Sequence, residues 1–450
     1  MKTKSMKRLF AIMMAGVIGL SLVGCGSNSS SSNEGNSDTS SESTSKGEDG
    51  TKGDIVLSLA FNAETSDPAY ENDIVPIFEE FMKLHPEVAE IKFTGMGKMT
   101  EDQQVTRLTG GQYDDVLLIP MGMPNKERPN FFASLGDATE LGEKYFYGDF
   151  IQSDGETYAL PIGVVYEGLV YNKKVLDECY GGKVPTTLDE LLEACEAIKA
   201  TGKTPFYTNA GAEWPLRFWD NLAITASETP DYANTLVSST APWADDEALH
   251  FSSSFLANLA ANDMVEPDTV TEQWDNSRIS VATGESAFML LGTWALPQVK
   301  DVAEEMGEDP DNISFMPFPY KNGVSADNKL NLRVSEDIFM GVNKNSENLE
   351  LAKELLVFFC ENISLSRGMN EIMREGGRNV EDLQFLQDLD YIEFYSSPAR
   401  TEEFEAISST SKIDVFSVGS YLQDNVIQPA INGEAPKFDA LNERWAAEIN

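Results

Sequence analysis

The sequence predicts an α/β fold with more than one lobe, and three observations support this expectation. Apolar runs suited to buried strands alternate with helical patterns between residues 54 and 119. The same alternation starts again near Tyr158 and continues well beyond the middle of the chain. The chain has 450 residues, which allows two or three lobes at roughly 150 residues for each.

Residues 54–119 are the first block of this alternation, and their pattern predicts a lobe with a parallel sheet. Strands are expected at residues 55–61, 90–94 and 115–119, where short apolar runs occur. Between them, apolar residues at helical spacing over 74–82 and a polar pattern over 100–109 predict two helices. The first of these helices should end before Pro86, because a residue that precedes proline disfavours the helical region. Strands and helices in this order form a right-handed parallel α/β unit.

The second block repeats this order of elements. Thr187 should begin a helix, since Glu190 follows three residues later in a capping-box arrangement. A further helix should follow residues 343–346, and the chain from residue 364 onward reads as mostly helical. The expected strands are 158–171, 205–208, 286–291, 313–318 and 338–342.

The charge balance excludes some classes of partner. Lys and Arg number 33 against 74 Asp and Glu, so the formal net charge is −41. A nucleic-acid partner is not expected, because phosphate binding needs a basic stripe. Two histidines leave little room for histidine catalysis or a histidine metal site, and we predict no metal and no cofactor.

The N-terminus predicts export and lipid attachment. Basic residues precede a short apolar run that ends in Leu22-Val23-Gly24-Cys25, which is similar to the lipobox of bacterial lipoproteins. We therefore expect a signal peptide over 1–24, lipidation of Cys25 and a disordered Ser/Asn-rich tether over 25–53. Such a tether is typical of a Gram-positive lipoprotein that is anchored by palmitate on the outer face of the membrane. Ordinary secretory cleavage beside a chance cysteine is the alternative.

The other cysteines do not form a disulfide framework. Cys179, Cys195 and Cys360 are odd in number. We expect Cys195 to be a small buried side chain within a helix. A bridge between Cys179 and Cys195 stays open at this point.

Catalytic motifs are absent from the sequence, whereas tryptophans gather near predicted strand ends. Nucleophile-elbow, zinc-protease and phosphate-loop patterns do not occur, and adjacent carboxylates are expected by chance among so many acids. Trp214 and Trp219 follow one predicted strand and Trp294 follows another. An indole offers a flat apolar face that can stack on a sugar ring. We interpret Trp219 as a core residue and Trp294 as a ligand contact, because loops at strand ends carry sites.

An ordered set of segments resembles one protein family. The segments 155–161 (GETYALP), 168–173 (GLVYNK), 185–191 (PTTLDEL), 283–294 (TGESAFMLLGTW) and 341–346 (GVNKNS) are similar to those of family 1 extracellular solute-binding proteins. These are the sugar-capturing lipoproteins of ABC importers, similar to maltose-binding protein. The resemblance covers about residues 54–445.

The resemblance implies a two-lobed periplasmic-binding-protein-like fold of type II, with a hinge and a central ligand cleft. It places residues 54–162 plus 338–400 in lobe 1 and residues 163–337 plus 401–450 in lobe 2. The expected ligand contacts, carried over by position, are Asn62, Glu64, Tyr166, Glu167, Asn209, Trp214, Trp294, Arg333 and Glu336. No catalytic residue is expected.

The leading functional hypothesis is therefore a lipid-anchored receptor that captures a mono- or oligosaccharide and delivers it to ABC permease subunits. Its expected partners are the carbohydrate, the permease and, through Cys25, the membrane. A surface-anchored glycoside hydrolase with a carboxylate pair is one alternative. A receptor of the same fold for a polyamine or another cation is a second, suggested by the acidity of the chain.

Overall fold

The computed structural model describes residues 53–99, 101–111, 113–120, 123 and 125–449, and the fold is that of this part of the chain. The predicted signal peptide over 1–24, the predicted lipidation at Cys25 and the tether up to residue 52 lie outside the described residues. Among the helices that are described, none is long and apolar enough to cross a membrane.

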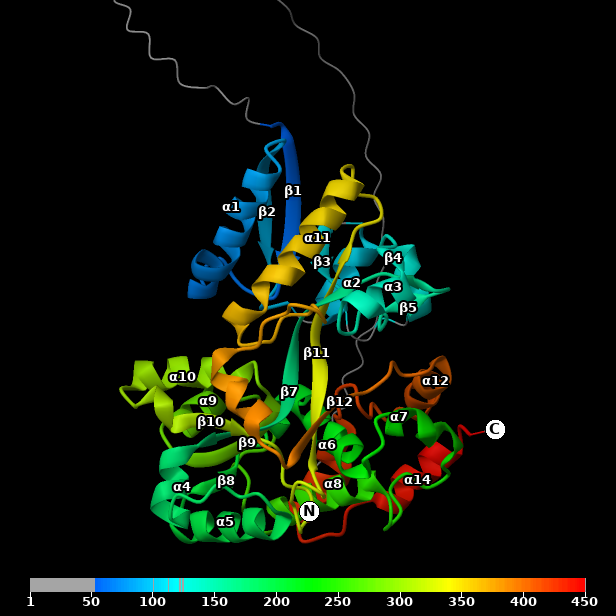
Figure 1. Cartoon of the computed structure of the whole chain (residues 1–450). Coiled ribbons are helices and arrows are strands. Elements are labelled where there is room, and N and C mark those ends of the chain that lie inside the picture. Colours follow the sequence, from blue (N-terminus) through cyan, green and yellow to red (C-terminus); the bar gives the residue numbers. More distant parts are fainter. Residues whose placement is uncertain (1–52, 100, 112, 121–122, 124, 450) are drawn as a thin grey trace, which may run out of the picture. The chain divides into compact units, whose positions relative to one another are not determined.

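One large sheet contains nine strands. Its order is β2-β1-β3-β11-β7-β9-β8, with β10 also paired to β7 and β12 also paired to β11. The two long strands β7 (Leu160–Asn172) and β11 (Leu330–Val342) are antiparallel neighbours in the middle of this order. Figure 1 shows them running between the upper and lower groups of elements.

The buried apolar residues form two separate cores that meet along β7 and β11. The first core contains buried residues from Leu57 to Val165 and from Phe339 to Ile372. The second contains buried residues from Tyr166 to Leu332 and from Leu383 to Trp445. Each long strand therefore contributes side chains to the first core in one part of its length and to the second core in the other part.

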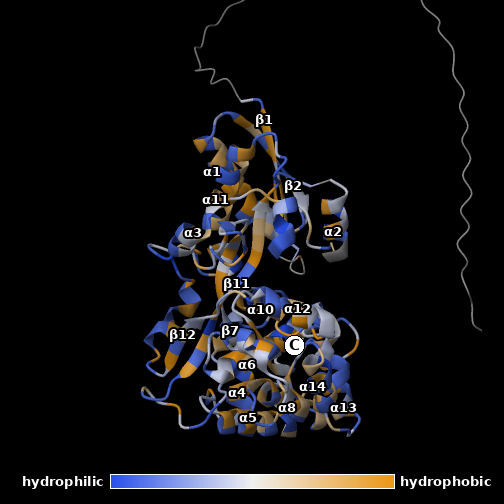
Figure 2. Ribbon diagram, turned by 90° about the vertical axis from the view of Figure 1, so that its right-hand side faces the viewer, coloured by the Kyte–Doolittle hydropathy of each residue, from blue (hydrophilic) through white to orange (hydrophobic). Residues whose placement is uncertain are grey.

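The first core has the parallel arrangement that the sequence predicts. Strand β1 (Ile55–Phe61) pairs in parallel with β2 (Val88–Gly95) and with β3 (Val116–Leu118), which confirms this block. Hydrophobic colours run along β1, while the helices mix both colours (Figure 2). The remaining elements around this core are α1 (Val75–Leu84), α2 (Glu101–Thr109), α3 (Ala138–Lys144), α11 (Leu349–Ile363) and a small sheet of β4 (Gly136–Asp137), β5 (Gln152–Ser153) and β6 (Glu156–Thr157).

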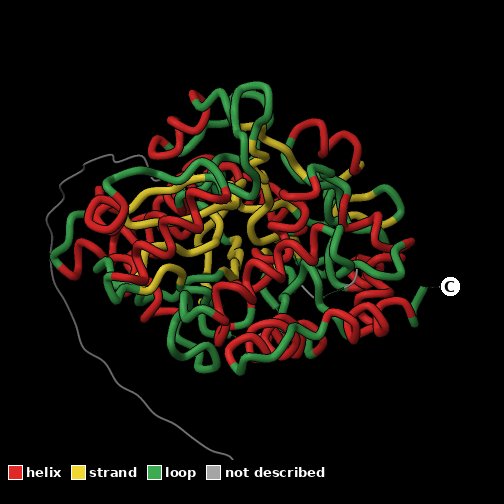
Figure 3. Tube along the Cα trace, turned by 90° about the horizontal axis from the view of Figure 1, so that it is seen from below, coloured by secondary structure: helices red, strands yellow, loops and turns green. Residues whose placement is uncertain are grey.

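The second core lies around the other half of the sheet. Most strands lie inside and helices surround them (Figure 3). The strands of this half are β8 (Thr204–Phe206), β9 (Ser286–Gly292), β10 (Ile313–Met316) and β12 (Ile392–Ser396). The helices are α4 (Lys173–Tyr180), α5 (Leu188–Ala200), α6 (Arg217–Ser227), α7 (Tyr232–Thr235), α8 (Ala248–Ala261), α9 (Trp274–Ala282), α10 (Ala295–Met306), α12 (Glu402–Ser411), α13 (Gln428–Ile431) and α14 (Phe438–Ala446). Thr187 caps α5 as predicted, because its side chain accepts a hydrogen bond from the backbone of Glu190.

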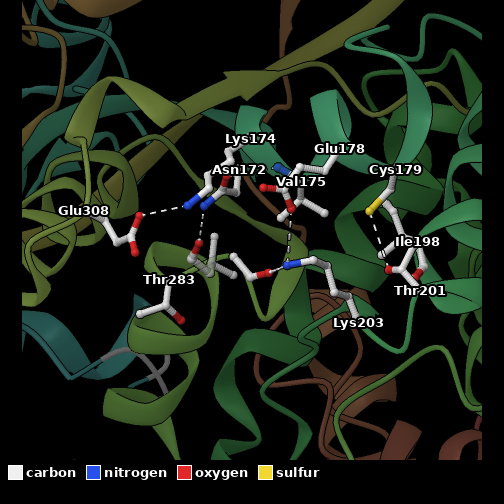
Figure 4. Close-up of polar contacts among 12 residues, drawn as sticks. Asn172, Lys174, Val175, Glu178, Cys179, Ile198, Thr201, Lys203, Thr283 and Glu308 are labelled. Carbon is white, nitrogen blue, oxygen red and sulfur yellow. Dashed lines mark hydrogen bonds and ion pairs between the residues drawn. The ribbon is translucent and has the colours of Figure 1, made fainter.

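Polar contacts fasten α4 to its neighbours (Figure 4). Asn172 caps α4 and also donates through Nδ2 to the carbonyl of Val281 at 2.8 Å. Lys174 pairs with Glu308 at 3.2 Å. The sulfur of Cys179 lies 3.5 Å from Thr201 Oγ1, and Cys179, Cys195 and Cys360 are all free thiols. The bridge between Cys179 and Cys195 that the sequence left open is therefore not formed.

Two elements differ from the sequence prediction. Strand β11 begins at Leu330, eight residues before the predicted start at 338. The first part of the strand was not predicted, because polar residues such as Arg333 interrupt its apolar pattern. Strand β12 lies within a segment that was expected to be mostly helical and pairs in parallel with β11. The buried residues Leu383, Leu386 and Ile392 belong to the second core.

Candidate functional site

A cavity of about 470 Å³ lies between the two cores, and we call it the central cavity. Its apolar wall combines Ile119, Met123, Ile151 and Phe339 of the first core with Ala233 and Phe416 of the second. The volume falls in the range typical of small-molecule sites. A ligand in this cavity would contact both halves of the described chain.

A buried ion pair joins the two long strands at the wall of the cavity. Arg333 of β11 and Glu167 of β7 are register partners, and Arg333 Nη1 donates to Glu167 Oε1 at 2.5 Å. Asn221 Nδ2 donates to the same oxygen at 3.1 Å. Burial lowers the pKa of Arg333, but Glu167 and Glu336 more than reverse this and hold the pKa above its ordinary value. Arg333 is therefore a cation although its side chain is almost completely buried.

The helix α6 presents a polar edge to the cavity. Arg217, Asn221 and Ile224 line the cavity, and their spacing of four and then three residues places them on one face of the helix. Arg217 is the first residue of α6. The start of this helix thus brings a guanidinium to the place where the two cores meet.

The charged residues around the central cavity balance one another. Five are basic and five are acidic: Lys126, Arg128, Arg217, Arg333 and Arg400, against Glu167, Asp231, Glu336, Glu402 and Glu405. The cavity is therefore close to neutral, although the chain as a whole carries a formal net charge of −41. Burial is the main cause that lowers the pKa of Arg128 to about 10, so Arg128 is still a cation at neutral pH.

Three half-buried tryptophans form a second feature, which we call the tryptophan cluster. The ring centroids of Trp214 and Trp274 are 5.2 Å apart, those of Trp214 and Trp294 are 5.7 Å apart, and those of Trp274 and Trp294 are 5.8 Å apart. Trp294 is the N-cap of α10 immediately after β9, and it packs against both cores. The cluster is a continuous aromatic surface at the junction of the cores.

A buried carboxylate holds the loop that precedes Trp214. Glu266 accepts hydrogen bonds from the backbone and side chain of Thr208, each at 2.7 Å, and from the backbone of Ala210 at 3.2 Å. Between them, Asn209 has a φ of +58°, a left-handed conformation that asparagine tolerates. Burial is the main cause that raises the pKa of Glu266 above its ordinary value.

Comparison with known proteins identifies the family. The family model "bacterial extracellular solute-binding protein" matches residues 67–361, which is more than half of the chain. The chain belongs to this family. A curated relative is the multiple sugar-binding protein of Streptococcus mutans, which is 24% identical over 342 residues that cover 73% of this chain and 76% of the relative.

Solved structures of similar shape include binding proteins and receptors. One is the binding protein BlMnBP1 of an ABC transporter from Bifidobacterium animalis subsp. lactis, in complex with mannobiose; it has a TM-score of 0.77 and 26% identity, and the match covers 89% of this chain and 96% of that one. The GacH receptor of Streptomyces glaucescens shares the fold, with a TM-score of 0.60 and 16% identity over 87% of this chain and 97% of that one. The predicted type II solute-binding fold is thereby confirmed.

This solute-binding protein brings five of the nine predicted contacts to the two features, and a sixth lies in the loop beside one of them. Glu167, Arg333 and Glu336 line the central cavity. Trp214 and Trp294 belong to the tryptophan cluster. Asn209 lies in the loop before Trp214, where it is 4% exposed and its Oδ1 has no partner within the described residues.

The other three predicted contacts lie elsewhere. Asn62 is exposed just after β1, and Glu64 accepts a hydrogen bond from the backbone of Lys98 at 3.1 Å. Tyr166 is 5% exposed, packs its ring on Phe394 and accepts a hydrogen bond from Gln387. None of the three lines the central cavity.

The sequence reasoning missed several residues of the site. Trp274 completes the tryptophan cluster, and Arg128, Arg217 and Asn221 line the cavity. Trp274 offered a signal as one of only six tryptophans in the chain, but the arginines had none in the sequence.

Metal ligation has no support in the described part of the chain. No group of three or more His, Cys, Asp or Glu side chains there could hold a metal ion. Two acidic residues of the cavity, Glu167 and Glu405, pair instead with the guanidinium groups of Arg333 and Arg400. The chemistry that this arrangement offers is hydrogen bonding and stacking.

Proposed function

We propose that this protein is the substrate-binding lipoprotein of an ABC importer and that it captures a carbohydrate between its two lobes for delivery to the membrane permease. The observation that carries the proposal is a cavity lined from both cores in a chain that also has a tryptophan cluster where Trp294 packs against both cores. Indole faces stack on the apolar faces of sugar rings, and the polar wall supplies hydrogen bonds to hydroxyl groups. The sugar-binding descriptions of the relatives support the same proposal.

Each of the two proposed lobes corresponds to one of the two cores. We propose a first lobe from 54 to about 165 plus about 339–372, and a second lobe from about 166 to 338 plus 383–449, with β7 and β11 as the hinge. A sugar that contacts both lobes stabilises the closed form over the open form, and this difference drives closure. We further propose that Cys25 carries the lipid that holds the protein on the outer face of the membrane.

Two features disfavour a cation as the ligand. The central cavity carries as many basic as acidic side chains, so its walls do not attract cations. The tryptophan ring centroids are 5.2–5.8 Å apart, which places the rings in contact with one another. A cage for an ammonium group needs rings that surround the cation rather than touch each other. The cluster therefore serves as a stacking surface.

The test is ligand binding by the purified chain. Thermal shift followed by calorimetry is measured with neutral mono- and oligosaccharides, with spermidine as the cation, and product release is monitored in the same samples. A ligand of the native state raises the melting temperature. We expect a neutral saccharide to bind and to be recovered unchanged. Binding of spermidine alone, or cleavage of the saccharide, contradicts the proposal.

A tryptophan variant locates the binding site. Trp294→Ala is expected to weaken saccharide binding about 30-fold, which corresponds to about 2 kcal/mol for a buried aromatic anchor. Phe438→Ala is the matched control, because Phe438 is also half-buried against the second core but does not belong to the tryptophan cluster. Equal affinities in both variants would remove the tryptophan cluster from the site.

A further inference from the structure

The loop that carries Trp214 contains a strained residue. Glu213 has a φ of +60° and a ψ of −57°, close to a γ-turn conformation that is rare and strained. Its side chain is exposed, so no burial of the glutamate offsets this strain. Glycine, which lacks a Cβ atom, would adopt the same conformation at little cost. Residues held in such sparsely populated regions persist only where the surrounding structure fixes them, and they gather at functional sites.

Contacts on both sides of Glu213 fix this conformation. Its backbone N–H donates to the carbonyl of Ala210 at 3.1 Å, and its own carbonyl accepts from the N–H of Leu216 at 2.8 Å. Ala210 and Leu216 are fully buried, so both ends of the loop are anchored in the second core. Pro215 restricts the chain further, because its ring fixes φ. Glu213 therefore joins two short 3-10 turns at the position directly before Trp214.

The same loop is pressed against the segment that carries Trp274. A Cβ atom at Gly211 would lie 2.1 Å from the carbonyl oxygen of Thr271, so the two backbones touch at this point. Trp274 follows Thr271 by three residues, and its ring centroid is 5.2 Å from that of Trp214. Glycine is required at 211 by this close approach, whereas the strained backbone at 213 is occupied by a residue with a side chain. The loop and its neighbour form one packed unit with Glu213 at its turn.

We propose that Glu213 is a positioning residue whose strained backbone fixes the direction of Trp214, so that the tryptophan cluster is formed before a sugar arrives. This inference rests on the proposed function, in which the cluster is the stacking surface. A residue with a Cβ atom is confined to a narrow region at positive φ, whereas glycine moves freely there. Because Glu213 holds Trp214 in place, binding loses no free energy to the ordering of this loop.

Three substitutions separate the backbone of Glu213 from its side chain. Glu213→Gly removes the Cβ atom, and Glu213→Ala keeps the Cβ atom but removes the carboxylate. Lys412→Gly is the matched control, because Lys412 is also exposed and has a positive φ of +57°. Its ψ of +37° places it in the ordinary left-handed region, and it lies at the C-cap of α12, outside the tryptophan cluster.

Urea unfolding and calorimetry should move in opposite directions for the glycine variant. Glu213→Gly should shift the folding equilibrium about fivefold toward the folded chain, because relief of strain exceeds the added freedom of glycine in the unfolded chain. The same variant should bind a neutral trisaccharide, chosen because it binds the wild-type chain, about fivefold more weakly, since Trp214 must then be ordered on binding. Glu213→Ala should match the wild type within about twofold in both measurements. Lys412→Gly should leave the affinity unchanged.

A double variant tests whether Glu213 acts through Trp214. In a chain that carries Trp214→Ala, the further change Glu213→Gly should no longer lower the affinity, because the side chain that it positions is absent. A purely structural role would change stability and affinity in the same direction, and it would not depend on Trp214.

Three results overturn the inference while the proposed function stands. One is a Glu213→Gly variant with unchanged affinity, and another is a Glu213→Gly variant that is no more stable than the wild type. The third is an equal loss of affinity in Glu213→Ala, which would make the carboxylate itself a ligand contact.

Circular dichroism without ligand provides a readout that does not depend on the proposed function. Indole rings in contact give an exciton band, which Glu213→Gly should reduce and Glu213→Ala should leave unchanged. An unchanged band in Glu213→Gly contradicts the positioning of Trp214. If no saccharide binds the wild-type chain, the proposed function fails, and the exciton band still decides whether Glu213 positions Trp214.

Discussion

The ion pair between Glu167 and Arg333 should hold the two long strands together at the junction of the cores. Both side chains are less than a tenth exposed, and their charged atoms are 2.5 Å apart. Glu167 also accepts a hydrogen bond from Asn221, whereas Arg333 has one further weak contact, to Ser397 at 3.5 Å. Removal of Arg333 therefore leaves a buried carboxylate with a single neutral donor.

The magnitude follows from this burial. At 2.5 Å and an effective dielectric constant of about 20, the Coulomb attraction is about 7 kcal/mol. Loss of one partner of a buried pair is commonly measured at about 3–5 kcal/mol, because the remaining charge stays unpaired. For ~400 ordered residues the unfolding entropy is about 0.8 kcal/mol/K, so Arg333→Met should lower the melting temperature by roughly 4–6 °C.

The assay is urea unfolding of Arg333→Met, Glu167→Leu and the double variant. Replacement of both charges leaves no unpaired ion, so the double variant should be more stable than either single variant. Lys83→Met is a control, since Lys83 forms an exposed pair with Glu80 and should change stability little. Strictly additive effects, or single variants as stable as the wild type, would refute the argument from burial.

Two further predictions concern buried carboxylates of the second core. Burial raises the pKa of Asp220 to about 8, so the folded chain binds this proton more tightly than the unfolded chain and loses stability as pH rises from about 4 to about 8. In urea unfolding, the stability advantage of the wild type over Asp220→Asn should therefore shrink across that pH range. A difference in stability that stays constant with pH would contradict the raised pKa of Asp220. Glu266→Gln puts a donor where Thr208 and Ala210 donate, and should cost about 1–3 kcal/mol. It should also weaken saccharide binding in calorimetry, whereas unchanged affinity would show that the loop before Trp214 does not depend on Glu266.

Regular elements were predictable where the local pattern was strong. The apolar run of β1 and the cap of α5 by Thr187 are set by neighbours a few residues apart, and both occur where the sequence placed them. Strand β11 was recognised only in its second half, since its first half carries Asn331, Arg333 and Ser335. These polar residues are tolerated there because β7 and β12 supply the pairing on both sides.

The candidate site was predictable only in part for a similar reason. Trp294 lies close behind β9, so its position in the sequence already indicated a surface at the end of a strand, whereas a loop and a short 3-10 turn separate Trp214 from β8. Tyr166 and Glu167 are adjacent in the same strand, yet one lies in the second core and the other lines the cavity. Side chains of a strand alternate between its two faces, and only the packing around the strand decides which face meets the cavity.

The amino-acid sequence by itself determined the family, the strands and helices with a strong local pattern, and the aromatic residues available for stacking, because these depend on local pattern and on motifs of a few residues. The tertiary structure decided which charged groups meet at the central cavity. Arg128, Arg217 and Arg333 are separated by about a hundred residues each, and only the folding of both cores against β7 and β11 brings them together.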